Sequence, residues 1–405
     1  MCKITKENDS LQRQTENKDE DSQELQCNKN IPELRFPEFE GEWITYKLCD
    51  VVTRIIRKNK NLETKRPLTI SAKYGLIDQI EFFDKYVASK NLKGYYLLKK
   101  GEFAYNKSYS NGFPYGAVKR LDLYNQGAIS TLYICFEITN KINSNFLKIY
   151  FDSNKWNKEM YKIAVEGARN HGLLNIPIND FFNTKHLFPS ISEQEKIADF
   201  LSAIDKKIGF MEKEINKQSK YMKKIRENIL NDNSDNSNKV QLKEICIINK
   251  GKQLNKTNMI NDGKYYVLNG GKTPSGFTNS WNVPENTISI SEGGNSCGFV
   301  NYNVQKFYCG GHCYYLTNIS DEIDPLLLYH CLKMNENKIM NLRVGSGLPN
   351  IQKKDLEKYK LYIPTKNHEK ITYLLNNINL KIDLNKEKLN HLKQFKKGLL
   401  QKMFC

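Results

Sequence analysis

Residues 197–229 read IADFLSAIDKKIGFMEKEINKQSKYMKKIRENI, and this stretch decides the fold class. One position recurs in it at alternating steps of four and three residues, and only Gln218 interrupts its apolar character: Ile197, Leu201, Ile204, Ile208, Met211, Ile215, Gln218, Met222, Ile225 and Ile229. A 3.5-residue repeat held this long predicts a coiled-coil helix rather than a globular surface helix. Ser192 and Glu195 predict a capping box at its start.

A second stretch near the end of the sequence has the same spacing. Its seam consists of Ile371, Leu375, Ile378, Ile382, Asn385, Leu389, Leu392, Lys396, Leu399 and Met403. A single long helix cannot bury such a seam alone, so each helix needs a partner. We expect the two seams to form one antiparallel pair, with a globular domain at each end.

The segments that precede the two helices resemble each other. Asp180 and Pro189 before the first helix correspond to Asp355 and Pro364 before the second, and both pairs are 175 residues apart. The domain starts also match, because Leu48-Cys49-Asp50-Val51-Val52 corresponds to Leu242-Lys243-Glu244-Ile245-Cys246. Short β-branched and aromatic runs between Gly and Asn turns predict strands in both copies. The sequence therefore predicts a tandem pseudo-two-fold repeat.

The predicted fold class is α+β, with two strand-rich globular domains separated by two long antiparallel coiled-coil helices. A run of Asn, Ser and Asp near the middle is typical of a linker. The expected organisation is a disordered tail at 1–30, a first domain at 31–190, a first helix at 191–231, a linker at 232–239, a second domain at 240–365 and a second helix at 366–405.

Charge and composition indicate the class of partner. Lys and Arg number 62 against 45 Asp and Glu, which gives a net charge of +17. Such an excess predicts a polyanion as partner, because each neutralised phosphate releases condensed counterions. No apolar run is long enough to cross a bilayer, so an anionic membrane surface is the weaker interpretation. The ten cysteines are scattered, which favours free thiols in a reducing cytoplasm.

Searches for chemistry in the sequence fail. Gly270-Gly271-Lys272-Thr273 resembles the end of a phosphate-binding loop, but Tyr266 stands where its first glycine belongs. Asn175-Ile176-Pro177-Ile178 lacks the second proline and the aromatic residue of an adenine methyltransferase motif. Cys309, His312 and Cys313 lack a second close ligand pair, so no metal site is expected. We expect no catalysis by this chain.

Several polar stretches are candidates for DNA contacts, with ordinary solvated turns as the alternative. Arg169, Asn170 and His171 crowd between two glycines, and Arg343 and Ser346 hold the matching place in the second copy. Arginine can bond guanine and asparagine can bond adenine, each with two hydrogen bonds. The other candidates are Asn106, Lys107, Ser108, Tyr109, Lys119, Arg120, Lys272, Thr273, Asn295 and Ser296.

Three short segments carry a family resemblance. They are Pro32-Glu33-Leu34-Arg35-Phe36-Pro37-Glu38-Phe39 with Trp43, Ile191-Ser192-Glu193-Gln194-Glu195-Lys196-Ile197-Ala198, and Phe395-Lys396-Lys397-Gly398-Leu399-Leu400-Gln401-Lys402-Met403-Phe404. Together they resemble the specificity subunit of type I restriction-modification enzymes. The second helix departs from the family in having Asn367-His368-Glu369 where Glu-Gln-Glu is usual.

The resemblance implies that two target-recognition domains read a bipartite, asymmetric site in double-stranded DNA. It also implies two methyltransferase subunits that carry S-adenosylmethionine and methylate adenine, and motor-nuclease subunits that use ATP and Mg. This chain itself is expected to bind no cofactor. Two alternatives are a free-standing DNA-binding nuclease, against which the absent motifs argue, and an architectural coiled-coil protein, which would need no strand-rich domains.

Overall fold

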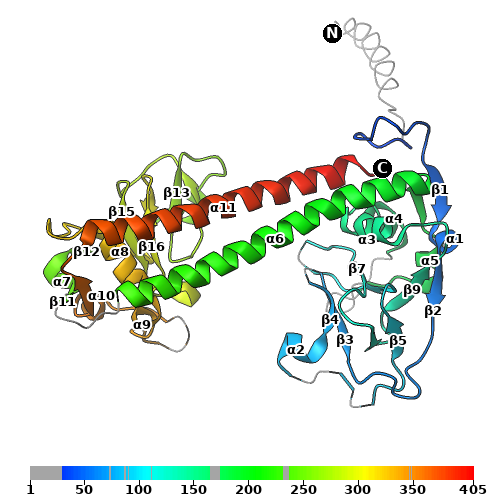
Figure 1. The fold of residues 1–405 in the computed structure, drawn as a ribbon, viewed down its shortest axis with the longest axis horizontal. Helices are drawn as coiled ribbons and strands as arrows, with labels where there is room; N and C mark the ends of the chain where they lie inside the picture. The colour runs from blue at the N-terminus through cyan, green and yellow to red at the C-terminus, as the bar shows by residue number, and fades with distance from the viewer. Residues whose placement is uncertain are drawn as a thin grey trace, which may run out of the picture. The chain divides into compact units, whose positions relative to one another are not determined.

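The computed structural model describes residues 30–405 except 73, 86, 87, 90, 111, 165–173, 231–236, 346 and 348. The tail predicted at 1–30 therefore lies, apart from Asn30, outside the described residues. The chain divides into two compact units. Unit 1 consists of Met1–Gly209 with Asn390–Cys405, and unit 2 consists of Phe210–Leu389. Each unit mixes strands and helices (Figure 1).

Unit 1 is built on a four-stranded antiparallel sheet in the order β2-β9-β6-β7. Three two-stranded sheets accompany it, with the orders β3-β4, β5-β8 and β1-β10. The strands are β1 (Ile44–Lys47), β2 (Val52–Ile55), β3 (Leu68–Ser71), β4 (Gly75–Asp78), β5 (Tyr96–Lys99), β6 (Phe103–Asn106), β7 (Ala117–Arg120), β8 (Gln126–Ile129), β9 (Ile134–Ile138) and β10 (Lys185–Phe188). The short helices are α1 (Leu48–Val51), α2 (Gln79–Phe83), α3 (Ser144–Asp152), α4 (Asn157–Ile163) and α5 (Ile178–Asn183).

Unit 2 is built on a four-stranded antiparallel sheet in the order β12-β18-β15-β16. Two smaller sheets have the orders β14-β13-β17 and β11-β19. The strands are β11 (Ser237–Gln241), β12 (Ile247–Lys250), β13 (Tyr265–Leu268), β14 (Gly276–Thr278), β15 (Thr287–Ser291), β16 (Val300–Asn303), β17 (Tyr308–Cys309), β18 (Cys313–Thr317) and β19 (Lys360–Pro364). The helices are α7 (Leu242–Ile245), η1 (Lys256–Asn258), η2 (Gly294–Ser296), α8 (Pro325–Met334), α9 (Glu336–Met340) and α10 (Lys353–Glu357).

The two units follow one plan down to strand register, which confirms the predicted tandem repeat. Ile44 in β1 lies opposite Phe188 in β10, and Asn238 in β11 lies opposite Ile363 in β19. These partners are separated by 194 and 175 residues, the same offsets that align the domain starts and the prolines in the sequence. The helix α1 also maps onto α7 at the offset of 194. Each pair of strands closes its domain just before a long helix begins.

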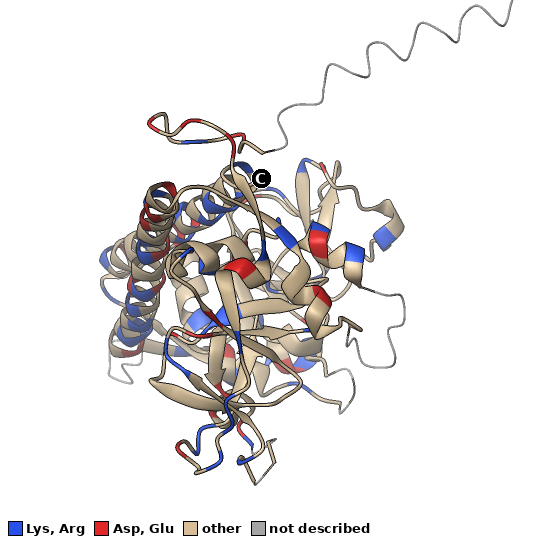
Figure 2. Ribbon diagram, turned by 90° about the vertical axis from the view of Figure 1, so that its right-hand side faces the viewer, with Lys and Arg blue, Asp and Glu red and all other residues tan. Residues whose placement is uncertain are grey.

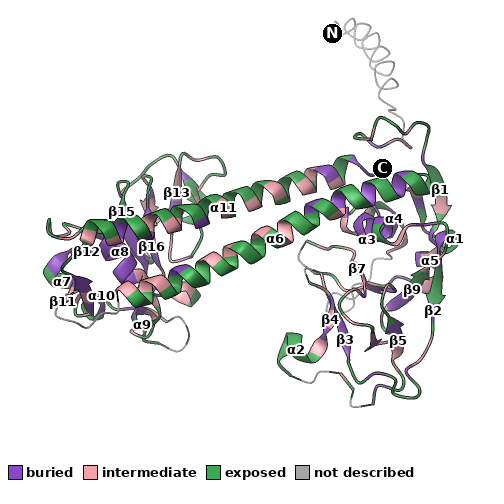
Figure 3. Ribbon diagram, viewed as in Figure 1, coloured by how far each residue is buried: buried purple, intermediate pink, exposed green. Residues whose placement is uncertain are grey.

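Two long helices, α6 (Ile191–Leu230) and α11 (His368–Lys402), each extend through both units. In unit 2, Asn385 Nδ2 donates to Gln218 Oε1 at 3.1 Å, and Arg226 Nη2 donates to Asn379 Oδ1 at 3.4 Å. Contacts therefore move backward along α11 as they move forward along α6, so the predicted antiparallel pairing is confirmed. Every residue of the two predicted seams is buried or half-buried, and Figure 3 shows exposed residues on the other helix faces.

The capping box predicted at Ser192 and Glu195 was wrong, because α6 begins two residues earlier than the prediction requires. Ser190 is the capping residue, and its Oγ accepts from the backbone N–H of Glu193 at 3.4 Å. The cause lies in the preceding strand: Phe188 ends β10 and precedes Pro189, which keeps Phe188 extended. Only one residue separates this proline from the first turn of the helix.

The two cores differ in composition. Unit 1 buries a cluster of aromatic rings in which Phe404, from the end of the chain, lies against Trp43, Phe146 and Tyr150. The core of unit 2 consists mainly of Leu and Ile side chains from α8, β15, β18 and the long helices. Aromatic rings bury more area per residue than aliphatic chains, so unit 1 obtains its core from fewer side chains.

Candidate nucleic-acid interface

In each unit one end of the main sheet gathers the loops that carry most of the predicted contact residues. In unit 1, β2 and β6 run in the same direction, because both are antiparallel to β9 between them. Their last residues, Ile55 and Asn106, therefore lie at the same end of the sheet. In unit 2, β12 and β15 are related in the same way through β18 and end at Lys250 and Ser291. We call these the loop ends of the two sheets.

The two loop ends have equivalent backbones and different chemistry. Followed from β2 and from β12, the strand pairings make Tyr105 of β6 equivalent to Ile290 of β15. Two residues further along, Lys107 and Glu292 therefore occupy the same place in the two units. A lysine only donates hydrogen bonds, whereas an ionised carboxylate only accepts them. The same scaffold thus presents different side chains in each copy.

In unit 2, three backbone segments are bonded to the residues that end β15. The backbone N–H of Glu292 donates to the carbonyl oxygen of His312 at 3.0 Å, and Ile351 N–H donates to the carbonyl oxygen of Glu292 at 2.8 Å. Ser291 Oγ donates to the carbonyl oxygen of Gly270 at 2.6 Å. The loops around Gly270, His312 and Ile351 are therefore held against one another as one surface.

The side chain of Glu292 keeps this arrangement rigid. It is buried, and its Oε1 accepts from Lys250 Nζ at 2.7 Å and from the hydroxyl of Tyr314 at 3.0 Å. Burial, with a further contribution from the Glu292 charge, raises the pKa of Tyr314 above its ordinary value, so this phenol stays a hydrogen-bond donor. Glu292 therefore positions the loops, and its bonded oxygen is not available to a ligand.

The candidate residues of unit 2 lie on these joined loops. Lys272, Thr273, Asn295 and Arg343 are exposed, and Ser296 is half-buried in η2. Lys272 Nζ lies 5.8 Å from the centre of a phenylalanine ring in the loop before β16, which keeps the ammonium beside the β15–β16 turn. These five side chains therefore share one surface. Ser346 lies outside the described residues.

In unit 1, residues that follow β6 serve the turn as well as the surface. Asn106 Oδ1 accepts from the backbone N–H of Ser108 at 3.1 Å, and Lys107 Nζ donates to the carbonyl oxygen of Ile176 at 3.2 Å. Tyr109 is 60% exposed, so it can reach a ligand. Leu174 N–H donates to the carbonyl oxygen of Lys107 at 2.9 Å, which fixes the chain there beside β6.

The predicted residues Arg169, Asn170 and His171 lie outside the described residues. The described chain resumes at Leu174, whose backbone is bonded to Lys107. Their role as DNA contacts stays a prediction.

Lys119 and Arg120 do not join the loop end. Arg120 lies opposite Phe103, the first residue of β6, whereas the loop end is at its last residue. Lys119 pairs with Asp152 at 2.6 Å, and Arg120 pairs with Asp122 at 2.7 Å. Both cations are thus partly neutralised within the protein, and their assignment as DNA contacts stays a prediction.

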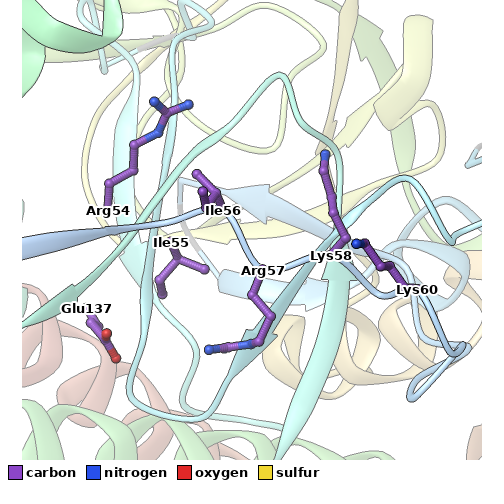
Figure 4. Close-up of a pocket in the computed structure, with 7 residues that line it drawn as sticks. All are labelled: Arg54, Ile55, Ile56, Arg57, Lys58, Lys60 and Glu137. Carbon is purple, nitrogen blue, oxygen red and sulfur yellow. The ribbon is translucent and has the colours of Figure 1, made fainter.

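The sequence reasoning missed a basic segment at the loop end of unit 1. Residues 54–60, RIIRKNK, follow β2 and line an open hollow of about 570 Å³ (Figure 4). The available signal was the density of charge, since four of these seven residues are cations. Basic residues are common elsewhere in the chain, including on the long helices (Figure 2), and this hid the cluster.

Other classes of site were searched for over the same part of the chain. Among the described residues no group of three or more His, Cys, Asp or Glu side chains could hold a metal ion. The eight described cysteines are free thiols. None of the described helices combines the length and apolar character that a bilayer span requires.

Comparison with known proteins places this geometry in a family. Residues 234–394 match the model of the type I restriction modification DNA specificity domain. A Mycoplasma pneumoniae protein whose name assigns it as a type I specificity subunit is 41% identical over 129 residues, or 32% of this chain and 34% of that protein. A similarly named Mycoplasma genitalium protein is 33% identical over 140 residues, or 34% of this chain and 36% of that protein. The matches thus span about a third of these relatives.

Solved structures extend the likeness in fold over the whole chain. The crystal structure of a type I restriction-modification S subunit from M. genitalium has a TM-score of 0.65 at 19% identity, covering 93% of this chain and 99% of that one. A chain from a study of the assembly and conformational transition of the type I system has a TM-score of 0.52 at 17% identity, covering 91% and 98%. With a specificity domain matched in sequence and the repeat plan matched in fold, the chain belongs to the family of type I restriction-modification specificity subunits.

Proposed function

We propose that this protein is the sequence-reading subunit of a type I restriction-modification complex and recognises a bipartite, asymmetric target in double-stranded DNA. Each unit reads one half-site through the loop end of its main sheet. Adenine methylation and DNA cleavage are carried out by partner subunits. The supporting observation is that two sheets of identical strand order and register carry unlike residues, such as Lys107 and Glu292, at equivalent places.

The proposal extends to partners and cofactors. Two methyltransferase subunits carrying S-adenosylmethionine assemble with this chain, and motor-nuclease subunits that need ATP and Mg join the complex. The chain itself binds none of these cofactors and acts in the cytoplasm. Its net charge of +17 suits a DNA-binding component, because phosphate contacts release counterions.

Mapping methylated adenines tests this function. In cells that carry this gene with its methyltransferase partner, we expect methylation at one two-part sequence, which disappears when the gene is deleted. Replacing residues 240–345 with the corresponding segment of a subunit of different specificity should change one half-site and leave the other unchanged. A change in both half-sites, or methylation that persists after deletion, would contradict the proposal.

The purified chain alone is expected neither to methylate nor to cut DNA. No catalytic motif is recognisable in the sequence, so activity should appear only when the partner subunits are added. The measurement is transfer of labelled methyl groups from S-adenosylmethionine to duplex DNA, with and without the methyltransferase subunit. Transfer by the isolated chain would overturn the assignment of catalysis to the partners.

A further inference from the structure

The basic segment at residues 54–60 has no role in the function as stated so far. It contributes Arg54, Arg57, Lys58 and Lys60 to the hollow at the loop end of unit 1. The remaining lining residues are two isoleucines and Glu137, which is the one acidic residue among them. The segment continues from β2, which is an edge strand of the main sheet. Its outer side therefore has no neighbouring strand in that sheet.

The backbone of this segment is fixed before any ligand binds. Leu97 N–H donates to the carbonyl oxygen of Arg57 at 2.8 Å, and Asn59 N–H donates to the carbonyl oxygen of Tyr95 at 3.0 Å. The buried side chain of Asn59 also donates to the carbonyl oxygen of Thr64 at 2.9 Å. The cations are thus mounted on an ordered scaffold, which lowers the entropy lost on binding.

Arg57 is committed to the protein interior. Its Nη2 lies 2.7 and 2.8 Å from the two carboxylate oxygens of Glu102, which is itself buried. This pair cancels the charge of Arg57. Figure 4 shows Arg57 extending to one side of the segment, whereas Arg54 and Lys58 extend to the other. Arg57 therefore anchors the segment and leaves binding to its neighbours.

Lys58 is held in place without being neutralised. Its Nζ lies 4.2 Å from the centre of the Tyr96 ring and donates to the carbonyl oxygen of Gly94 at 2.9 Å. Neither partner carries a net charge, so the ammonium keeps its own. Over the described part of the chain, no acidic side chain forms an ion pair with Arg54, Lys58 or Lys60. Three uncompensated cations therefore face an open surface.

The second copy retains one of these cations. At the offset of 194 residues that aligns β1 with β11, Lys58 corresponds to Lys252. Lys252 follows the edge strand β12, and its backbone N–H donates to the carbonyl oxygen of Cys309 at 2.9 Å. Its side chain is exposed. A lysine thus leaves the edge strand at the same place in both units, although the flanking residues differ.

We propose that Arg54, Lys58 and Lys60 bind backbone phosphates of the DNA target and set its position on unit 1 without reading bases. The inference rests on the proposed function, since it assigns these residues to the same DNA. Phosphates are the ligand that fits, because the hollow presents charge on flexible side chains rather than the paired donors and acceptors that discriminate bases. Tyr109 and its neighbours at the end of β6 remain the candidates for base contacts.

The test is the salt dependence of DNA binding by the full-length chain. Each phosphate contact contributes about 0.9 to the slope of log affinity against log salt. The triple variant R54Q/K58Q/K60Q should therefore have a slope smaller by about 2.7, so that its loss of affinity between 50 and 200 mM salt is roughly 40-fold smaller than that of the wild type. Its order of preference among DNA sequences should stay unchanged.

A variant with the same change of charge serves as control. Lys47, Lys141 and Lys185 are exposed residues of unit 1 at the opposite end of the main sheet, near the first residue of β2 and the last residue of β9. K47Q/K141Q/K185Q should keep the wild-type slope within about 0.5. Thermal unfolding checks that both variants are folded.

The possible outcomes separate the two proposals. If the wild-type chain binds duplex DNA and the triple variant keeps its slope, or the control loses as much, this inference is overturned while the proposed function stands. If the wild-type chain binds no duplex DNA, both fail. Added inorganic phosphate at constant ionic strength should not displace the DNA. Displacement from the wild type but not from the triple variant would indicate a free-phosphate site instead.

Discussion

At the residue scale, the carboxylate of Glu193 is the most consequential single group in unit 1. It is 1% exposed and accepts two hydrogen bonds from Arg35, at 2.8 and 2.7 Å, and one from Trp43 Nε1 at 3.3 Å. Arg35→Ala should lower the free energy of unfolding by about 3–5 kcal/mol, because it leaves a buried charge without its partner. Denaturant titration measures the loss. Lys196→Ala, which breaks an exposed pair with Glu38, should cost less than about 1 kcal/mol, and equal losses would contradict the argument.

Two buried histidines predict how stability depends on pH. Burial lowers the pKa of His186 to about 4, and burial together with the nearby Arg226 charge lowers that of His330 to about 3. In the unfolded chain both titrate near 6.5, so acidification protonates the unfolded state first. Their stabilisation is complete above about pH 6.5 and is lost as the pH falls toward 4 and 3, by at most about 1.4 kcal/mol per pH unit for each histidine. Unfolding measured from pH 8 to 5 should fall less steeply in His330→Gln, and an unchanged slope would refute the assignment.

At the scale of elements, the polar residues within the seams are paired rather than misplaced. In unit 2, Gln218 of α6 and Asn385 of α11 bond to each other at 3.1 Å. Such a pair fixes register at a cost in stability. Q218L/N385L should therefore raise the free energy of unfolding by roughly 1–3 kcal/mol, whereas either single change should lower it by about 1 kcal/mol, because one amide then faces leucine. Chemical denaturation of the three variants gives the sign. A destabilised double variant would show that the hydrogen bond matters more than apolar burial.

At the scale of the whole molecule, the helices should set the gap between half-sites. Removing one heptad from each helix, residues 208–214 and 389–395, keeps both seams in phase and shortens the pair by about 10 Å at 1.5 Å per residue. With about 3.4 Å per base pair, the gap should shrink by about three base pairs. Methylated sites mapped in cells that express the deletion variant should keep both half-sites. A change in the recognised bases would contradict separate reading by the two units.

The sequence by itself determined the repeat, the two seams and the α+β class, because these depend on local periodicity and on offsets that the chain carries in its residue order. The helix start at Ile191, the bond between Gln218 and Asn385 and the meeting of loops around Glu292 needed the tertiary structure. Strand order decides which loops share an end of a sheet, and that order comes from pairings between residues far apart in the chain. For the same reason Lys119 and Arg120 were grouped with Asn106 although an antiparallel strand places them at the far end of β6, and the cations at 54–60 went unnoticed until β2 was seen to run beside β9 in the direction of β6.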